Sequence, residues 1–289
     1  MLDEKWLESQ WLTHCGDGFP RDILLWGRGH PQRFSAYNVE HFLQLIWKYL
    51  FTFSIAVNVF PHSFLSSASE TLCNKIYLDL DSKADITLAY NDMQHLVDYL
   101  KGKFNYVPRV YFSGNKGFHI FLDLPSVMLS NYRDTMIQFV TKYLPPIKTL
   151  DIQTLKDRNR VSRLPYTIHQ GSGRLCAPID YATELSILLN NKLNKYPNIV
   201  IDSNMEFSKI LCDIDQEISD KKVDEEEVRP SHNKIRPCIL VAQNQSMNDS
   251  NGALMRLAVA IEYLYTHHNP KDIAPLFKNQ DDYDYNKSL

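Results

Sequence analysis

The segment Lys75–Asp81 restricts the fold of this chain most strongly. It reads Lys-Ile-Tyr-Leu-Asp-Leu-Asp, and its apolar residues predict a largely buried β-strand. Successive side chains of a strand point to opposite faces, so Asp79 and Asp81 lie on the same face at the end of this strand. Hard divalent cations prefer several carboxylate oxygens as ligands. The strand therefore predicts a platform for a metal ion, although a second Asp-x-Asp pair, Asp213 and Asp215, shows that such a pair alone is a weak signal.

Strand and helix patterns alternate on both sides of this segment. We predict further strands over 54–60, 109–113, 118–122 and 173–178 and near Asp151, and helices over 89–103 and 131–143. Residues 1–53 read as helical apart from a loop. This alternation predicts an α/β or α+β core.

The charges are distributed unevenly, although the net charge is only −3. Residues 101–174 hold twelve lysines and arginines against four acidic residues, whereas residues 202–228 hold ten acidic residues against three basic ones. A basic central segment is compatible with a phosphate-bearing partner, and we interpret the acidic run as a solvated or disordered stretch. We place a domain boundary at its end, giving a catalytic domain over 1–225 and a small all-helical module over 226–289, with helices over 253–267 and 270–277.

The cysteines do not form a ligand motif. Cys15, Cys73, Cys176, Cys212 and Cys238 are widely spaced and include no Cys-x-x-Cys, so we expect neither a zinc ribbon nor a disulfide framework. The first residues are charged, without the apolar core of a secretion signal, and no apolar run reaches membrane-spanning length. We expect a reducing, cytoplasmic location.

The segment Ser113–His119, Ser-Gly-Asn-Lys-Gly-Phe-His, lies between two predicted strands. Its two glycines permit a tight turn and a close backbone approach to a ligand. Ser113, Asn115, Lys116 and His119 supply groups that suit an anion such as a triphosphate. The alternative is an ordinary hairpin with a polar tip.

A third group of polar residues follows Leu150. Asp151 can supply a further carboxylate. The arginines and histidine behind it are donors for the phosphates of a nucleotide or of a nucleic acid: Arg158, Arg160, Arg163 and His169.

These motifs, in this order, resemble the catalytic subunit of archaeal and eukaryotic DNA primases. The resemblance covers about residues 19–180 and includes the spacing of Arg163 and His169 behind Asp151. It is carried by Asp79-Leu-Asp81, Ser113–His119, Asp151, the stretch Pro165-Tyr-Thr-Ile-His169 and the stretch Gly173-Arg-Leu-Cys-Ala-Pro-Ile-Asp180.

The resemblance implies the archaeo-eukaryotic primase superfamily and a catalytic core with an RRM-like sheet. It implies two Mg²⁺ or Mn²⁺ ions held by Asp79, Asp81 and Asp151. It also implies that six residues hold the phosphates of an incoming NTP or dNTP: Ser113, Asn115, Lys116, His119, Arg163 and His169. The expected activity is primer synthesis on a single-stranded DNA template.

Two departures from the family pattern concern metal clusters and the C-terminus. The chain has no cysteine cluster for the zinc-binding insertion of that family. Cys238 matches a cluster-ligating cysteine of primase large subunits, but no cysteine follows it, so we expect neither zinc nor an iron–sulfur cluster. The C-terminal module resembles part of the large-subunit helical module, and we expect the chain to be a fragment of a longer replication protein, with a helicase domain as one possible partner.

Three alternatives remain open on sequence grounds. An end-joining or translesion polymerase of the same superfamily shares all of these residues. A metal-dependent glycosyltransferase also uses Asp-x-Asp, but it does not need Ser113–His119 or the basic segment. A catalytically inactive binding subunit is expected to have lost one of the three carboxylates, and all three are present.

Overall fold

The computed structural model describes residues 3–16, 18–27, 30–61, 70–190 and 197–228, together with Val259. The chain divides into two compact units, Met1–Asp220 and Lys221–Leu289. Almost all of the second unit lies outside the described residues. The helices predicted over 253–267 and 270–277 fall there, and the boundary near residue 225 stays a prediction.

Two antiparallel four-stranded sheets organise the first unit. The first sheet has the order β2-β1-β3-β7 and consists of β1 (Arg21–Trp26), β2 (Gln32–Ala36), β3 (Ser54–Asn58) and β7 (Val161–Arg163). The second has the order β4-β6-β5-β8 and consists of β4 (Thr71–Asp81), β5 (Arg109–Phe112), β6 (Gly117–Leu129) and β8 (Ala177–Ile179).

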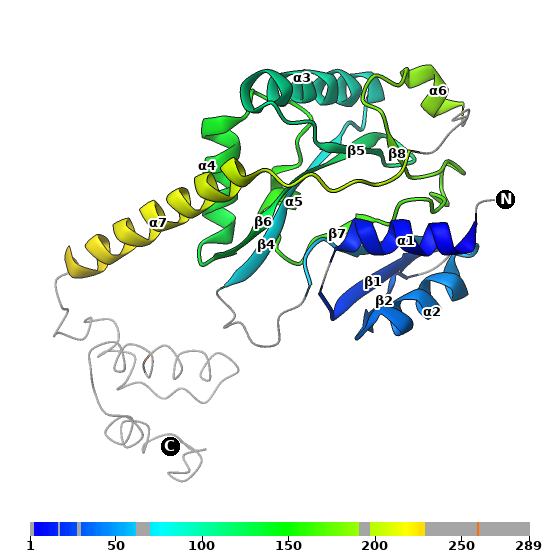
Figure 1. The fold of residues 1–289 in the computed structure, drawn as a ribbon, viewed down its shortest axis with the longest axis horizontal. Helices are drawn as coiled ribbons and strands as arrows, with labels where there is room; N and C mark the ends of the chain where they lie inside the picture. The colour runs from blue at the N-terminus through cyan, green and yellow to red at the C-terminus, as the bar shows by residue number, and fades with distance from the viewer. Residues whose placement is uncertain are drawn as a thin grey trace, which may run out of the picture. The chain divides into compact units, whose positions relative to one another are not determined.

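The helices of the described part of the chain are distributed between the two sheets. They are α1 (Glu4–Cys15), α2 (Val39–Tyr49), α3 (Ile86–Phe104), α4 (Tyr132–Tyr143), α5 (Ile152–Lys156), α6 (Leu185–Leu189) and α7 (Met205–Val228). Figure 1 shows α1 and α2 beside the first sheet, and α3 and α4 beside the second. This mixture of helices with antiparallel sheets confirms the predicted α/β (α+β) class. Within the described residues, no helix is long and apolar enough to cross a membrane.

The alternation of side chains along β4 separates an apolar face from a polar one. Leu78 and Leu80 are fully buried, and α3 packs against β4 and β6. Tyr77, Asp79 and Asp81 point to the opposite face because they occupy the alternate positions. The strand thus carries its carboxylates away from the helices of its own sheet.

The prediction of helix for residues 1–53 is partly wrong, because a β-hairpin lies between α1 and α2. Ile23 and Leu25 are fully buried at alternate positions of β1, which is the period of a strand. On the other face of β1, Asp22 accepts hydrogen bonds from Arg33 (2.6 Å) and Ser35 (2.7 Å) of β2. These cross-strand contacts decide the local structure, and they cannot be read from propensity.

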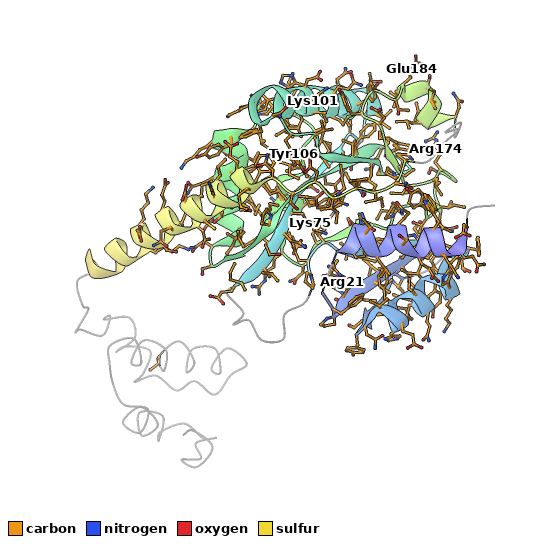
Figure 2. All side chains as sticks on the ribbon, viewed as in Figure 1. Arg21, Lys75, Lys101, Tyr106, Arg174 and Glu184 are labelled. Atoms are coloured by element: carbon orange, nitrogen blue, oxygen red, sulfur yellow. The ribbon has the colours of Figure 1, made fainter. Side chains whose placement is uncertain are left out.

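Two buried basic side chains hold the C-terminal end of α1 between the sheets (Figure 2). Arg21 from β1 and Lys75 from β4 both donate to the carbonyl oxygen of Cys15, at 2.7 and 3.0 Å. The last carbonyls of a helix have no partner inside the helix and carry its negative dipole end. Because Arg21 and Lys75 belong to different sheets, this contact fixes one sheet against the other.

Most of the acidic run 202–228 forms α7, so of the two interpretations, solvated or disordered, a solvated helix face is the one observed. Phe207, Leu211 and Ile214 of this helix are buried, so it has a packed face as well as an acidic one. Asp215 accepts hydrogen bonds from the backbone amides of Ser130 and Asn131, at 3.0 and 2.8 Å. Asp215 of the second Asp-x-Asp pair therefore supports the N-terminal end of α4.

Candidate active site

A cavity of about 240 Å³ lies at the polar face of β4 and also borders the first sheet. The strand β4 contributes Asp79 and Asp81, and the turn between β5 and β6 contributes Lys116. The other lining residues come from β1, β3, β4, β6, β7, the turn between β5 and β6, and the chain on both sides of β7. They are Trp26, Ala56, Tyr77, Ser113, Asn115, Gly117, His119, Arg160, Val161, Arg163 and His169. The structure therefore brings together both carboxylates of the strand and all six predicted phosphate-binding residues.

Each carboxylate of the pair lies next to a cation. Oδ2 of Asp79 is 3.3 Å from Nη2 of Arg160, and Oδ2 of Asp81 is 3.0 Å from Nζ of Lys116. Asp79 lies opposite His119 in the β4–β6 register, and Asp81 lies opposite Gly117. The pairing of the two strands therefore places the carboxylates directly beside the Ser113–His119 segment.

Burial changes the acid–base properties of Asp79. Desolvation raises its pKa to about 6, and the charges of Asp81 and Asp151 act in the same direction, while Arg160 opposes them. A single guanidinium therefore does not compensate the charge concentrated at this strand end. An additional cation in the cavity would favour the ionised form.

The two glycines of the Ser113–His119 segment are required by contacts within the protein. A Cβ atom on Gly117 would come within 2.1 Å of the Leu80 carbonyl oxygen, because β6 approaches β4 closely here. Gly114 has a φ of +84°, and a Cβ there would lie 3.1 Å from the Arg174 carbonyl oxygen. The glycines thus let the turn fit between β4 and the segment around Arg174, and the close backbone approach to a ligand stays a prediction.

His119 is a neutral imidazole at physiological pH. Burial lowers its pKa to about 3, and the nearby charges of Arg163 and Arg160 lower it further. Its Nε2 lies 3.8 Å from Oδ1 of Asp79, and its Nδ1 is buried without a hydrogen-bond partner among the described residues. His119 can therefore exchange a hydrogen bond with a ligand without contributing a positive charge.

The cavity also contains arginine donors that the described part of the protein does not satisfy. Nε of Arg160 and Nη1 of Arg163 are buried and have no hydrogen-bond partner there. Unpaired buried donors are costly, by roughly 1–3 kcal/mol each, and they commonly mark the place of a ligand or of water. Charged donors of this kind suit the oxygens of phosphate groups.

His169 lies on the same side of the cavity as Arg163. Its Nδ1 accepts a hydrogen bond from the Ser172 amide at 3.1 Å, so the neutral ring carries its proton on Nε2. Burial lowers the pKa of His169, and the charge of Arg163 adds to this effect. The ring is thus fixed as a neutral donor.

Asp151 lies next to Asp79 in the backbone, but its carboxylate does not line the cavity. The Asp151 amide donates to the Asp79 carbonyl oxygen at 2.9 Å, and Leu150 forms an isolated bridge with Leu80 at the free edge of β4. The chain then turns into α5, so the strand predicted near Asp151 is reduced to this bridge. The Asp151 carboxylate accepts hydrogen bonds from the Gln153 amide (2.9 Å) and the Thr154 hydroxyl (2.6 Å).

The pKa of Asp151 reflects this helix cap. Partial burial opposes ionisation, but the hydrogen bonds from Thr154 and Gln153 outweigh it and lower the pKa. Asp151 is therefore an ionised carboxylate. It lies near enough to Asp79 to raise the pKa of that residue.

The residues at the end of β4 fit a hard divalent cation. No group of three or more histidine, cysteine, aspartate or glutamate side chains is placed to hold a metal within the described ranges. Mg²⁺ in phosphate-handling sites uses one or two carboxylates together with water and substrate phosphates, so Asp79 and Asp81 are sufficient as protein ligands. Arg160 and Lys116 each lie against one of these two carboxylates, and a metal cation held by the pair would supply further positive charge.

Sequence reasoning missed two features of the cavity. Trp26 and Tyr77 line it, and Trp26 was hidden by the incorrect helix prediction for residues 1–53. Arg160 was predicted to bind phosphate, whereas one of its nitrogens pairs with Asp79. The alternation of residues in β1 could have revealed Trp26. In a strand, Ile23 and Leu25 lie on one face, and Trp26 lies on the other.

Comparison with known proteins identifies the class of fold. No protein-family model and no curated protein matches the chain. Among solved structures, the crystal structure of the primase RepB′ is similar over 98% of this chain and 92% of that chain, with 10% identity and a TM-score of 0.50. The protein therefore has a fold similar to that of the primase RepB′.

Two further solved structures are similar at a lower level. The catalytic domain of RepB′ in complex with initiator DNA has a TM-score of 0.49 at 10% identity, over 76% of this chain and 98% of that chain. The AEP domain of the cyanophage S-2L primase-polymerase has a TM-score of 0.44 at 12% identity, over 63% of this chain and 92% of that chain. The fold assignment rests on the first comparison alone.

Proposed function

We propose that the protein is a DNA primase-polymerase, which transfers nucleotides to a growing strand on a single-stranded DNA template. The main observation is that one cavity holds a carboxylate pair and, beside it, buried arginine donors without a hydrogen-bond partner in the described chain. A nucleoside triphosphate with its divalent cation presents the complementary charges. The primase fold supports the same assignment.

In this proposal Asp79, Asp81 and Asp151 would hold Mg²⁺ or Mn²⁺. The metal would supply a lower pKa for the attacking 3′-hydroxyl and positive charge for the triphosphate. Lys116 and Arg163 contribute positive charge to the phosphates, and the neutral rings of His119 and His169 contribute hydrogen bonds. Ser113 and Asn115 bind from the turn. Catalysis then depends mainly on positioning and on charge stabilisation.

The alternatives differ in what they leave unexplained. A metal-dependent glycosyltransferase gives no role to the Ser113–His119 turn or to the unpartnered nitrogen of Arg163. An end-joining or translesion polymerase uses the same cavity and differs in needing a strand end to extend. The distinction is therefore one of substrate, and an assay of the whole chain can make it.

The decisive assay offers the purified chain an unprimed and a primed single-stranded DNA template. Labelled NTPs and dNTPs are supplied in parallel, with Mg²⁺ or Mn²⁺ and with EDTA as the control. We expect metal-dependent products on both templates. Products on the primed template alone would identify an extending polymerase, and the absence of products on both would contradict nucleotidyl transfer.

A further inference from the structure

Trp26 differs from the other three tryptophans of the chain. Each of the others has a structural role: the indole N–H of Trp6 donates to Asn198, that of Trp11 to the Pro165 carbonyl oxygen, and that of Trp47 to Glu8. Trp11 and Trp47 also pack against each other with ring centroids 5.1 Å apart. Trp26 has no aromatic neighbour and no indole hydrogen bond among the described residues, and it is 37% exposed.

The position of Trp26 links the candidate active site to a second space beside it. This adjoining space, of about 380 Å³, is lined by Trp26, Gly27, Ser54, Arg163, His169, Gln170 and Gly171. Trp26, Arg163 and His169 line both spaces, so the two adjoin at these side chains and are together called the cleft. A ligand that contacts Arg163 can therefore extend toward the indole ring.

The two parts of the cleft differ in charge. Asp79, Asp81, Lys116 and Arg160 belong only to the part at the end of β4. Among the described residues, those found only in the adjoining part are Gly27, Ser54, Gln170 and Gly171, which are uncharged. A nucleotide also has a charged end and a neutral end. Its triphosphate is strongly charged, and its base is a flat, neutral aromatic ring.

Hydrogen bonds fix the wall beside Trp26. Trp26 lies opposite Ser54 in the β1–β3 register. The Ser54 hydroxyl donates to the Ile168 carbonyl oxygen (3.3 Å) and accepts from the Gln170 amide (2.8 Å). The segment that carries His169 is thus tied to the strand next to Trp26, and the distance from the phosphate donors to the indole ring is set by the fold.

From this arrangement we propose that Trp26 stacks on the base of the incoming nucleotide. The inference rests on the proposed function, because it takes the charged end of the cleft as the triphosphate site. Base–aromatic stacking tolerates all four bases, since every base has a π-face. Trp26 therefore contributes nucleotide affinity without selecting a base.

The test compares two ligands that differ only in whether they contain a nucleoside. Dissociation constants for a dNTP and for inorganic tripolyphosphate are measured by calorimetry on the full chain with Ca²⁺. The variants are Trp26→Ala, Trp26→Phe and Arg163→Ala. The control is Tyr37→Ala, which removes a 63% exposed aromatic residue that does not line the cleft.

We expect Trp26→Ala to weaken dNTP binding about tenfold, the scale of one stacking contact, and to leave tripolyphosphate binding unchanged. Trp26→Phe should restore most of the affinity, and Arg163→Ala should weaken both ligands. The inference is overturned if Trp26→Ala leaves dNTP binding unchanged, or if it weakens both ligands equally. It is also overturned if Trp26→Ala weakens binding of a single-stranded oligonucleotide but not of dNTP, which would assign the ring to the template. Failure of the unsubstituted chain to bind either ligand would instead contradict the proposed function.

Discussion

At the scale of single residues, Asp79 carries a charge that the folded protein does not favour. Its pKa is raised from the ordinary value of 3.8 to about 6. Between these two values the folded state binds more protons than the unfolded state, so the free energy of unfolding falls as the pH rises through this window. Above pH 6 the full penalty of the ionised carboxylate is present.

We therefore predict that Asp79→Asn stabilises the metal-free protein near pH 7.5, by about 1–3 kcal/mol, at 1.36 kcal/mol for each unit of pKa shift. Near pH 4 the gain should be small, because Asp79 is then protonated in the folded state. Urea denaturation in EDTA at the two pH values measures the effect, with the exposed Asp213→Asn as the control. A stability change that is independent of pH, or a loss of stability at pH 7.5, would contradict this description of Asp79.

Residue types predict much of the cavity lining, but they do not predict the protonation states and charge pairing of its side chains. Asp79, Asp81 and the six phosphate-binding candidates could be named from motifs, because each supplies a group that the chemistry needs. The neutral state of His119 and the pairing of Arg160 with Asp79 depend on burial and on approach in three dimensions. These properties arise from residues that are distant in the sequence.

At the scale of elements, the start of α5 combines a structural and an electrostatic role for Asp151. Its carboxylate accepts from the Gln153 amide as an N-cap, and its charge raises the pKa of Asp79. Asparagine caps helices about as well as aspartate but carries no charge. The two roles can therefore be separated by substitution.

We predict that Asp151→Asn changes the free energy of unfolding by less than about 0.5 kcal/mol, whereas Asp151→Ala lowers it by about 1 kcal/mol through loss of the cap. Both variants should lose nucleotide transfer by at least about tenfold, because the third carboxylate has lost its charge. Denaturation measures the free energy of unfolding, and primer extension by the same preparations measures nucleotide transfer. Full activity of Asp151→Asn would show that Asp151 acts only as the helix cap and not in nucleotide transfer.

Elements with a strong internal pattern were predicted well, and those decided by tertiary contacts were not. The strand β4 and the helix α3 follow from apolar periodicity. The strand β7 has only three residues and exists because it pairs with β3, with Arg163 opposite Ala56. The helix α7 contains many acidic residues, and its apolar face became informative only with the packing of Phe207.

At the scale of the whole first unit, the candidate site depends on the assembly of two sheets. Trp26 comes from β1, Asp79 from β4 and Arg163 from β7, so more than a hundred residues of sequence separate parts of one cleft. Arg21 and Lys75 fix the sheets against α1. They are buried basic side chains, and sequence patterns do not identify them. The fold class could therefore be predicted, but not the division into two sheets or the cleft at the end of β4.

The most direct test of the central claim is metal-dependent incorporation of a labelled nucleotide on a primed template by Asp81→Asn. Asp213→Asn is the matched control, because Asp213 belongs to the second Asp-x-Asp pair and is exposed on α7. We predict that Asp81→Asn lowers incorporation by at least about a hundredfold, with the fold intact, because the proposed function makes Asp81 a ligand of the catalytic cation. Asp213→Asn should match the unsubstituted protein. Substantial incorporation by Asp81→Asn at saturating Mn²⁺ would contradict the assignment of this strand end as the site of nucleotide transfer.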